Sequence, residues 1–436
     1  MSAVKVGLLG LGTVGGGTAT VLIRNAEEIS ARLGREIVIS HVAGLDIASQ
    51  SIVDPAVTKL TEDAFEVVND PEVQIVVELI GGYTLAKDLV LKAIENGKHV
   101  VTANKALIAT HGTEIFKAAS VKGVSVCYEA AVAGGIPIIK AMREGLAANK
   151  IQWVAGIING TGNFILTEMR DKGRDFTEVL KEAQELGYAE ADPTFDVEGI
   201  DAAHKLTILA SLAFGIELQF EKTYTEGISK ITPDDVNYAG ELGYRIKHLG
   251  VARKTARGIE LRVHPTLIPA KRLIANVDGV MNAVLVQGDA VGPTLYYGAG
   301  AGAEPTASAV VADIIDTVRT IDAPLEHKVP LLGFQNEAMR DTPVLGIDDV
   351  ETAYYLRMQA DDQPGVLAEV SDTFAKNSIS IEAVVQKEPA SGESSVKLIM
   401  LTQKCLESQV NKAIAAVESL ASVQGEVVRI RVEHLD

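Results

Sequence analysis

An aspartate and a lysine four residues apart are the pair whose types and spacing most directly suggest chemistry. Asp201 and Lys205 stand at i and i+4 of a predicted helix that begins near Gly199, so their side chains share one face. An exposed pair of this kind is usually a weak surface ion pair. Most of the other residues of this helix are apolar, which predicts that it is buried. Because lysine is almost never buried without a partner or a function, we interpret Asp201 and Lys205 as candidate catalytic residues.

An acidic loop lies just before this helix. It follows a second predicted helix, which ends at Gly187, a residue type suited to the left-handed conformation that closes many helices. The loop carries four carboxylates, on Glu190, Asp192, Asp196 and Glu198. We therefore expect the stretch 183–212 to be the centre of the functional site.

The start of the chain carries a dinucleotide-binding pattern. An apolar run at residues 4–9 predicts a buried strand, and a long helical stretch follows the turn Gly10-Leu11-Gly12-Thr13-Val14-Gly15. In this context the glycines let the backbone approach a pyrophosphate, and the free N–H groups of the helix receive it. A purely structural turn is the less favoured alternative.

The choice of coenzyme depends on the residues that follow the second predicted strand, 36–43. The first predicted helix is expected to run on through Arg32, before this strand. Gly44, Leu45 and Asp46 follow this strand, where such domains contact the adenosine ribose. A carboxylate there can accept a hydrogen bond from the 2′-hydroxyl and repel a 2′-phosphate, so Asp46 favours NAD. Lys59, on a later loop, leaves NADP open as an alternative.

Three further loops follow predicted strands and leave alternatives open. Lys105 follows the strand 98–103, where a ligand contact and a solvated loop lysine are equally consistent with its position. Glu129 ends the strand 125–129 and precedes a Gly/Ala loop, which could expose carbonyls to a hard cation or simply form a tight turn into a helix that starts at Pro137. The run 159–163 after the strand 151–158 fits ordinary capping of the helix 164–172 or an anion site for a substrate carboxylate.

A glycine-rich run at residues 298–303 stands immediately before a strongly apolar helix. We interpret it as a backbone wall against the cofactor in preference to a flexible linker, because it adjoins a helix that must be buried. Pro305 is expected at the first position of that helix.

The elements that must position these residues predict an α/β fold class in three parts. Alternating apolar strands and helices predict a Rossmann-like doubly wound parallel sheet over residues 1–132, completed by about 303–340. A change of pattern predicts a central α+β catalytic and dimerisation domain over 133–302, and 341–352 reads as a linker. The stretch 353–436 has the βαββαβ order of a ferredoxin-like module.

Composition restricts the class of protein. With 47% hydrophobic and 22% charged residues, the chain is globular. A net charge of −18 argues against non-specific binding to nucleic acid or to an anionic membrane. We expect no signal peptide and no membrane span. The two cysteines, Cys127 and Cys405, are far apart and predict neither a disulfide framework nor a thiolate metal site, so a cytoplasmic location is expected.

Taken together, the motifs resemble the homoserine dehydrogenase family in its long bacterial form, which ends in an ACT domain. The most specific match is AQELGYAEADPTFDVEGIDAAHK at 183–205, and GLGTVG, TANK, YEAAVAGGIP, NGTGNF and GAGAEPTASA match further family blocks in the right order. The family interconverts L-homoserine and L-aspartate 4-semialdehyde with NAD or NADP, in threonine and methionine biosynthesis. The resemblance therefore implies an NAD(P)-dependent oxidoreductase.

The resemblance also implies roles for individual residues. It places Lys205 as the proton donor, with Lys105 and Asp201 as the other catalytic residues. The substrate is expected to contact Glu190, Asp201, Lys105 and Thr161. The expected cofactor positions are Gly10, Gly12, Thr13, Val14, Gly15, Asp46, Thr102, Lys105, Gly187, Glu190 and Gly302. A structural sodium ion is expected at Glu129 and the carbonyls of Val132, Gly134 and Ile136. The sequence departs from the family at Gly44-Leu45, where relatives that prefer NADP tend to carry arginine.

The chemistry is consistent with these residues. Reduction of an aldehyde by hydride leaves a developing alkoxide, which needs a proton donor and a cation. Two lysines supply both, and apolar surroundings are expected to lower the pKa of Lys205, while Asp201 holds its ammonium group and opposes too deep a shift.

Two other functions compete with this interpretation. A phosphorylating semialdehyde dehydrogenase needs a thiolate nucleophile, and neither cysteine is suitably placed. An amino-acid-sensing regulatory protein with a degenerate dehydrogenase scaffold is the main alternative, although both lysines and the acidic loop are present. In the ACT-like module, residues 362–367 and Gln386 lie on expected ligand loops, which suggests feedback by threonine or, alternatively, a purely oligomerising role. A homodimer through the central domain is expected from the family, and ACT pairing could make it a homotetramer.

Overall fold

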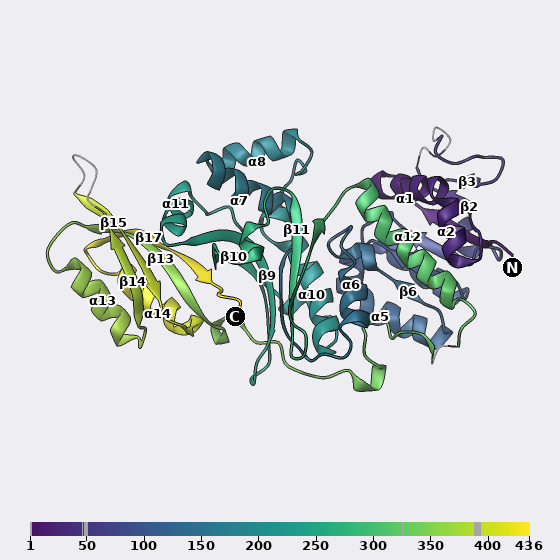
Figure 1. Ribbon diagram of the computed structural model, residues 1–436. Helices are drawn as coiled ribbons and strands as arrows, with labels where there is room; N and C mark the ends of the chain where they lie inside the picture. The colour runs from purple at the N-terminus through teal and green to yellow at the C-terminus, as the bar shows by residue number, and fades with distance from the viewer. Residues whose placement is uncertain (1, 46, 48–50, 325–326, 388–393) are drawn as a thin grey trace.

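A six-stranded parallel sheet forms one end of the molecule (Figure 1). The computed structural model describes residues 2–436 except 46, 48–50, 325–326 and 388–393. The strands are β1 (Val4–Leu9), β2 (Ile37–Ala43), β3 (Lys59–Thr61), β4 (Ile75–Glu78), β5 (His99–Thr102) and β6 (Val126–Cys127). Their order is β3-β2-β1-β4-β5-β6, and every pairing is parallel. The predicted Rossmann-like sheet is confirmed, and strand order reverses beside β1, where such sheets bind ligands.

Helices cover both faces of this sheet. The helices are α1 (Thr13–Arg24), α2 (Ala26–Leu33), α3 (Ala64–Asn69), α4 (Thr84–Glu95), α5 (Lys105–Lys122) and α12 (Ala303–Thr320). Apolar residues of α1, α2 and α12 pack on one face, and those of α3, α4 and α5 pack on the other. In Figure 1, α12 lies beside α1 although the two are far apart in sequence. The single first helix that the sequence suggested is wrong, because the chain breaks at Asn25, which ends α1 and caps α2.

The central part of the chain carries the helix with the Asp201–Lys205 pair. Its elements are α6 (Ile138–Lys140), β7 (Ile151–Ile157), α7 (Gly160–Lys172), α8 (Phe176–Glu185), α9 (Thr194–Val197), α10 (Ile200–Phe214), β8 (Tyr224–Thr225), α11 (Pro233–Glu241), β9 (Tyr244–Lys254), β10 (Ile259–Pro269), β11 (Met281–Gly288) and β12 (Gly292–Ala299). Strand Ser125–Glu129 is shorter than expected, since a 3-10 turn begins at Glu129. Helix α7 begins earlier than expected, with Asn159 as its cap.

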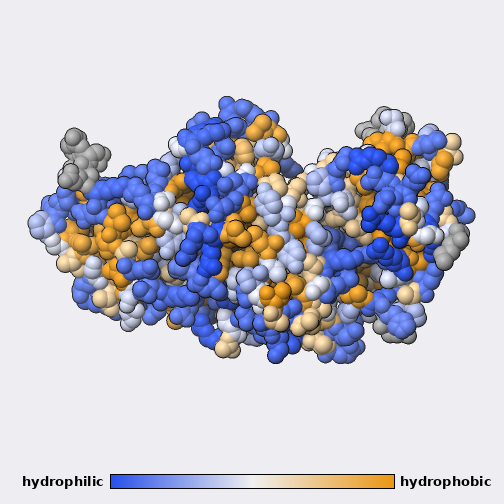
Figure 2. All heavy atoms as spheres, in the orientation of Figure 1, coloured by the Kyte–Doolittle hydropathy of each residue, from blue (hydrophilic) through white to orange (hydrophobic). Residues whose placement is uncertain are grey.

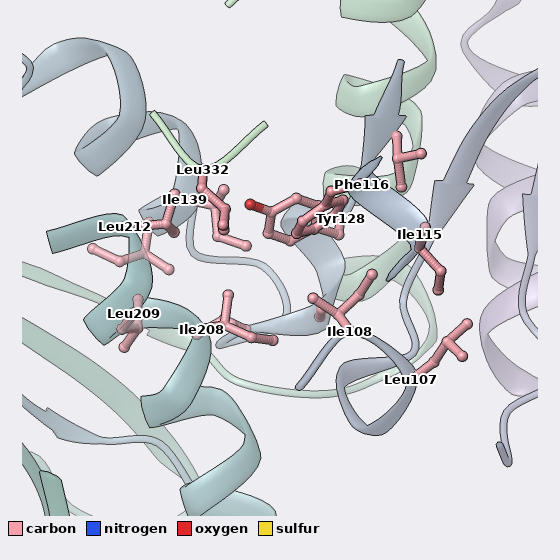
Figure 3. Packing of buried hydrophobic residues seen from close by; sticks show 14 of the residues in the cluster. Leu107, Ile108, Ile115, Phe116, Tyr128, Ile139, Ile208, Leu209, Leu212 and Leu332 are labelled. Atoms are coloured by element: carbon pink, nitrogen blue, oxygen red, sulfur yellow. The ribbon is translucent and has the colours of Figure 1, made fainter. Parts of the chain in front are cut away.

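A continuous apolar core joins α10 to α5. Leu107 and Ile108 of α5 belong to the same buried cluster as Ile208 and Leu209 of α10 (Figure 3). The first residue of α5 is Lys105. The packing therefore fixes the relative position of the two helices that carry the candidate lysines.

The C-terminal module has the predicted βαββαβ order. It comprises β13 (Glu351–Asp361), α13 (Val366–Lys376), β14 (Ile381–Gln386), β15 (Ser395–Thr402), the short β16 (Cys405–Leu406), α14 (Glu407–Glu418) and β17 (Val423–Val432). Strand β17 pairs in parallel with β10, so the module and the central part share one eleven-stranded sheet. This sharing was not predicted from the sequence.

The surface is mainly hydrophilic on the face shown in Figure 2, with apolar patches between the hydrophilic regions. In the part of the chain that the structure describes, none of the helices combines the length and apolar character needed to cross a membrane.

Candidate active site

Asp201 and Lys205 form a nearly buried ion pair, as their spacing predicted. The Lys205 Nζ lies 2.6 Å from Asp201 Oδ2 and also donates a hydrogen bond to the Ile158 carbonyl, at 2.7 Å. The side chain of Lys205 is only 11% exposed and that of Asp201 only 6%. Because two of the three ammonium hydrogens are bound to protein oxygens, one remains for another partner.

A second lysine contacts the same carboxylate. Lys105 lies at the start of α5, where Asn104 caps the helix by accepting a hydrogen bond from the Leu107 N–H. The Lys105 Nζ lies 3.2 Å from Asp201 Oδ1. One buried carboxylate therefore bridges two ammonium groups from two helices, a contact that local sequence spacing could not predict.

The local charges shift the pKa values of the pair. Burial lowers the pKa of Lys205, an effect that Asp201 opposes and Lys105 reinforces. Burial alone would raise the pKa of Asp201, but the ammonium groups of Lys205 and Lys105 hold it well below its usual range. The expected direction for Lys205 is confirmed, and Asp201 stays ionised at neutral pH.

Asn159 connects the start of α7 to this ion pair. Its Oδ1 accepts a hydrogen bond from the Gly162 N–H at 2.7 Å and so caps the helix. Its Nδ2 donates to Asp196 Oδ1 at 2.8 Å and to Asp201 Oδ2 at 2.9 Å. Burial, together with the nearby charge of Asp201, raises the pKa of Asp196.

These groups line a cleft of about 570 Å³ between the parallel sheet and the central part of the chain. The predicted residues on its wall are Thr13, Val14, Lys105, Gly134, Thr161, Gly187, Glu190, Asp201, Lys205 and Gly302. Those outside the lining are Gly10, Gly12, Gly15, Thr102, Glu129, Val132 and Ile136. Asp46 lies outside the described residues. Most of the expected catalytic, substrate and cofactor positions therefore meet in one cavity.

The turn at the start of α1 has the shape that a dinucleotide site requires. Gly10 has φ +95°, and a Cβ on Gly15 would lie 2.1 Å from the Gly10 carbonyl oxygen. A Cβ on Gly12 would instead project into open space beside the N-terminus of α1. The turn is therefore tight where the backbone must fold and open where a phosphate would lie, which fits a dinucleotide.

Thr102 does not line the cleft but supports the adjoining chain through hydrogen bonds. Its hydroxyl donates to Glu78 Oε2 at 2.7 Å and accepts from the Asn104 N–H at 2.9 Å. The side chain is fully buried, so its hydrogen bonds are used inside the protein. Its effect on a cofactor would pass through the position of Asn104.

The glycine-rich run before α12 is packed backbone. A Cβ on Gly300 would lie 2.0 Å from Asn282 Nδ2, and one on Gly134 would lie 2.5 Å from the Gly300 carbonyl oxygen. The run is therefore a wall of the cleft, and the linker alternative is excluded. Pro305 is not at the first position of α12, because the helix already begins at Ala303 after Gly302.

Comparison with known proteins decides the family. Models of three families match the chain: "Homoserine dehydrogenase" at residues 137–315, "Homoserine dehydrogenase, NAD binding domain" at 10–129 and "ACT domain" at 354–421. The homoserine dehydrogenase of Pseudomonas aeruginosa is 65% identical over 436 residues, covering 100% of both chains. The chain belongs to the homoserine dehydrogenase family. It is an oxidoreductase with an NAD-binding domain.

Other homoserine dehydrogenases agree with this assignment. The enzyme of Neisseria gonorrhoeae is 58% identical over 435 residues, again covering 100% of both chains. The crystal structure of the one from Thiobacillus denitrificans is 64% identical with a TM-score of 0.95, covering 100% of this chain and 99% of that one. The structure from S. aureus at pH 7.5 is 32% identical with a TM-score of 0.77, covering 99% of each chain. The three-part fold is thus that of homoserine dehydrogenases.

The carboxylate of Glu129 in this homoserine dehydrogenase is held by backbone N–H groups. Its carboxylate oxygens accept hydrogen bonds from the Ile139 and Lys140 N–H groups, at 2.8 and 2.7 Å. Burial raises its pKa to about 7. Each carboxylate oxygen keeps a second lone pair, so these bonds do not prevent Glu129 from supplying an oxygen to a cation.

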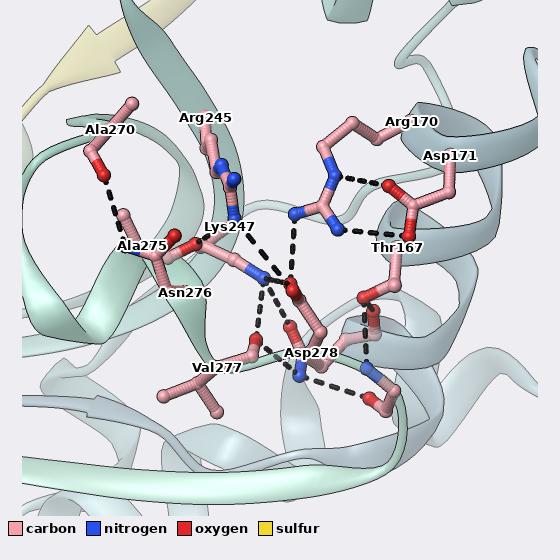
Figure 4. A network of polar contacts seen from close by, with 12 residues as sticks. Thr167, Arg170, Asp171, Arg245, Lys247, Ala270, Ala275, Asn276, Val277 and Asp278 are labelled. Carbon is pink, nitrogen blue, oxygen red and sulfur yellow. Dashed lines mark hydrogen bonds and ion pairs between the residues drawn. The ribbon is translucent and has the colours of Figure 1, made fainter.

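A network of polar contacts centred on the buried Lys247 and on Asp278 lies just before strand β11 (Figure 4). Lys247 is 1% exposed and donates to Asp278 Oδ1 at 3.0 Å and to the Val277 carbonyl at 2.6 Å. Asn163 of α7 donates to the carbonyls of Val277, Gly279 and Met281. The network fixes the segment that brings Val280 and Asn282 to the cleft of the dehydrogenase.

The thiol of Cys127 cannot serve as a nucleophile. It is buried against the Thr317 hydroxyl, and burial raises its pKa to about 12. This agrees with a homoserine dehydrogenase and argues against the phosphorylating alternative.

Asn159 and Asn282 are among the residues of the dehydrogenase's cleft whose place there was missed from the sequence. Asn159 was interpreted only as a cap or part of an anion site, and its bonds to Asp196 and Asp201 were not foreseen. Asn282 was not singled out at all, although it is 1% exposed and lines the cleft. A polar residue within an otherwise apolar strand was the available signal for Asn282.

Proposed function

We propose that Lys205 and Lys105 divide the proton chemistry of the family's reaction, the interconversion of L-homoserine and L-aspartate 4-semialdehyde. When bound, the nicotinamide coenzyme supplies or accepts the hydride. Charge then develops on the oxygen at C4 of the substrate, and two cationic groups converge where that oxygen would lie. The observation that carries the proposal is Asp201 bridging both ammonium groups at the wall of the cleft.

Lys205 is the better proton donor of the two. Its side chain is 11% exposed and burial lowers its pKa, so its proton is more readily transferred than that of an ordinary lysine. It would give a proton to the aldehyde oxygen in reduction and take one from the hydroxyl in oxidation. Lys105, which is 34% exposed, would stabilise the negative oxygen.

The amino-acid end of the substrate fits the opposite part of the cleft. The exposed carboxylate of Glu190 can accept hydrogen bonds from the α-ammonium group. The first N–H groups of α7 lie on the same wall and suit the α-carboxylate. The Thr161 hydroxyl donates to the Tyr188 carbonyl at 2.5 Å, so its oxygen is left as an acceptor for the α-ammonium group.

NAD is the coenzyme that we propose. Asp46 supports it from the sequence, and Lys59, the base that could favour a 2′-phosphate, lies 2.9 Å from Glu66. The test measures initial rates of homoserine oxidation with NAD and NADP, for wild type and for Asp46→Ala. Preference for NAD that the substitution abolishes supports the proposal. Preference for NADP contradicts the role of Asp46, and reduction of neither coenzyme favours the amino-acid sensor.

A structural sodium ion is part of the proposal. Among the described residues, no backbone N–H outside the helices and strands donates to the Val132 or Gly134 carbonyl. The Ile136 carbonyl accepts one bond, from the Ile138 N–H, and keeps a second lone pair. Together with the carboxylate of Glu129, these oxygens fit a hard cation. Thermal stability that rises with added sodium, but not with added choline, supports the site.

Feedback by threonine is the proposed role of the ACT domain. Residues 362–365 connect β13 to α13, and 366–367 begin that helix. Gln386, the last residue of β14, donates from its Nε2 to Asp362 Oδ1 at 3.4 Å, so the two expected ligand segments are adjacent. Threonine at millimolar concentration is expected to lower the rate of homoserine oxidation. Equal rates with and without it would leave the oligomerising role.

A homodimer through the central domain is the proposed assembly. Strand β12 is an edge of the long sheet, and Tyr297 on it is 58% exposed, so an apolar edge is open to a second copy. Light scattering with size exclusion distinguishes dimer, tetramer and monomer.

A cytoplasmic location stays a prediction, consistent with two free, buried cysteines.

A further inference from the structure

We propose that Asn159 is a positioning residue that holds the two carboxylates of the site, Asp196 and Asp201, in place beside Lys205. This inference rests on the proposed role of Lys205 as the proton donor. Capping of α7 alone would be the ordinary explanation for an asparagine at this position.

The orientation of the Asn159 amide is fixed by its surroundings. The Oδ1 faces an N–H donor, that of Gly162, and the Nδ2 lies between two carboxylate oxygens, at 2.8 and 2.9 Å. Reversing the amide would place an oxygen between two carboxylates, so only one orientation satisfies every partner. The side chain is 6% exposed, which makes each of these bonds hard to replace with water.

The position of Asn159 in the chain strengthens this arrangement. The preceding residue, Ile158, accepts a hydrogen bond from the Lys205 ammonium group at 2.7 Å. Two consecutive residues at the end of β7 therefore hold both members of the ion pair, one through a carbonyl and the other through an amide. A small displacement at this point would move Asp201 and Lys205 together, away from the oxygen that they must reach.

The amide also separates two like charges. Asp196 comes from α9 and Asp201 from α10, and both carboxylates approach the same Nδ2. A neutral group with two hydrogens serves both without adding charge. Replacement by a carboxylate would place a third acid beside Lys205 and stabilise its ammonium form.

Other titratable groups also face the pair. Lys105 approaches from α5, His204 from α10 and His248 from β9. Burial lowers the pKa of His204 to about 4 and also lowers the pKa of His248, so both are neutral at the pH of the assay. Asp196, whose pKa burial raises, is the other acid beside the pair. Changes in the pH profile above neutrality are therefore not those of the two histidines.

Two substitutions separate capping from positioning. Asn159→Ser keeps a good helix cap but loses the two N–H donors. Asn159→Asp keeps the cap and the shape but replaces the donors with a charge. Each purified variant is compared with wild type for kcat, KM for homoserine, the pH profile of kcat/KM for oxidation, the Kd of the coenzyme and thermal stability. Asp175→Ser, which changes the exposed cap of α8, is the control for altered capping.

The proposal predicts distinct results for the two variants. Asn159→Ser is expected to lower kcat about 10- to 100-fold, with a homoserine KM within about threefold of wild type and an unchanged coenzyme Kd. Asn159→Asp is expected to move the rising limb of the profile to higher pH. Asp175→Ser is expected to change neither.

Either of two results would overturn the proposal: a kcat for Asn159→Ser within about twofold of wild type, or a rising limb for Asn159→Asp that stays in place or moves to lower pH. Lys205→Ala tests the proposed function separately. If Lys205 is not the proton donor, this variant keeps the kcat of wild type, whatever the result for the Asn159 variants.

Discussion

At the scale of single residues, the site depends on a carboxylate that serves two lysines. The Asp201–Lys205 pair could be predicted because both residues lie on one turn of one helix. The Lys105–Asp201 contact could not, since it joins helices whose approach depends on the packing of the whole core. The same holds for Asn159, whose type predicts a cap but whose second pair of bonds depends on where Asp196 and Asp201 arrive.

Asp201→Asn is expected to move the rising limb of the pH profile to lower pH. Asp201 raises the pKa of Lys205, so loss of its charge leaves burial and Lys105, both of which lower that pKa. Because oxidation needs the neutral amine, the limb follows the pKa downward, while kcat falls as the ammonium group loses its support. The measurement is kcat/KM for homoserine oxidation across pH. A limb that moves upward would contradict this account of the charges.

At the scale of elements, the close approach of α1 and α12 completes the dinucleotide-binding part. The N-terminus of α1 faces the cleft, and Gly17 on this helix lies against the backbone of Ala303, the first residue of α12. The sequence predicted both helices and their apolar character. The sequence predicted that the segment 303–340 completes this domain, but it did not predict the contact of Gly17 with Ala303. Hydrophobic periodicity does not say which residues of two helices touch.

Gly17→Ala is expected to destabilise the protein, because its Cβ would lie 2.6 Å from the Ala303 carbonyl oxygen. The cost of forcing two helix backbones apart is about 1–3 kcal/mol in the free energy of unfolding. Gly16→Ala is the matched control: its Cβ would meet the end of the flexible Ile52 side chain at 3.2 Å and the Leu11 carbonyl oxygen at 3.6 Å, an ordinary contact distance. Helix propensity favours alanine at both positions, so Gly16→Ala is expected to be neutral or stabilising by up to about 1 kcal/mol. Denaturant unfolding of both variants tests the comparison, and equal losses would show that the α1–α12 contact is not special.

At the scale of the whole molecule, the ACT domain is continuous with the catalytic sheet through β10 and β17. The βαββαβ order was predictable from the alternation of apolar segments, but the pairing of β17 outside its own module was not, because edge pairing leaves no local pattern. Buried charges support this junction. Arg431 of β17 is fully buried and lies 2.8 Å from Glu226 Oε2, and it also pairs with Glu407 of α14.

Arg431→Met is expected to lower the free energy of unfolding by about 1–3 kcal/mol, since the buried Glu407 loses one of its two arginine partners and keeps only Arg429, at 2.9 Å. The control is Arg24→Met, which removes an arginine from the exposed pair with Glu304, where the side chains are 51% and 57% exposed. That substitution removes an exposed bidentate pair and is expected to cost less than about 1 kcal/mol. Chemical denaturation compares the two, and a stable Arg431→Met variant would show that the junction does not depend on this charge.

The central claim is that Lys205 moves the proton in the reaction, and Lys205→Ala tests it most directly. Steady-state kinetics of homoserine oxidation give kcat and KM for this variant, with Lys181→Ala, which removes a lysine that is 79% exposed, as the control. The account predicts that Lys205→Ala lowers kcat by about 10²- to 10⁴-fold with little change in KM, while Lys181→Ala behaves as wild type. A change confined to KM would mean that Lys205 only binds the substrate and would contradict the account.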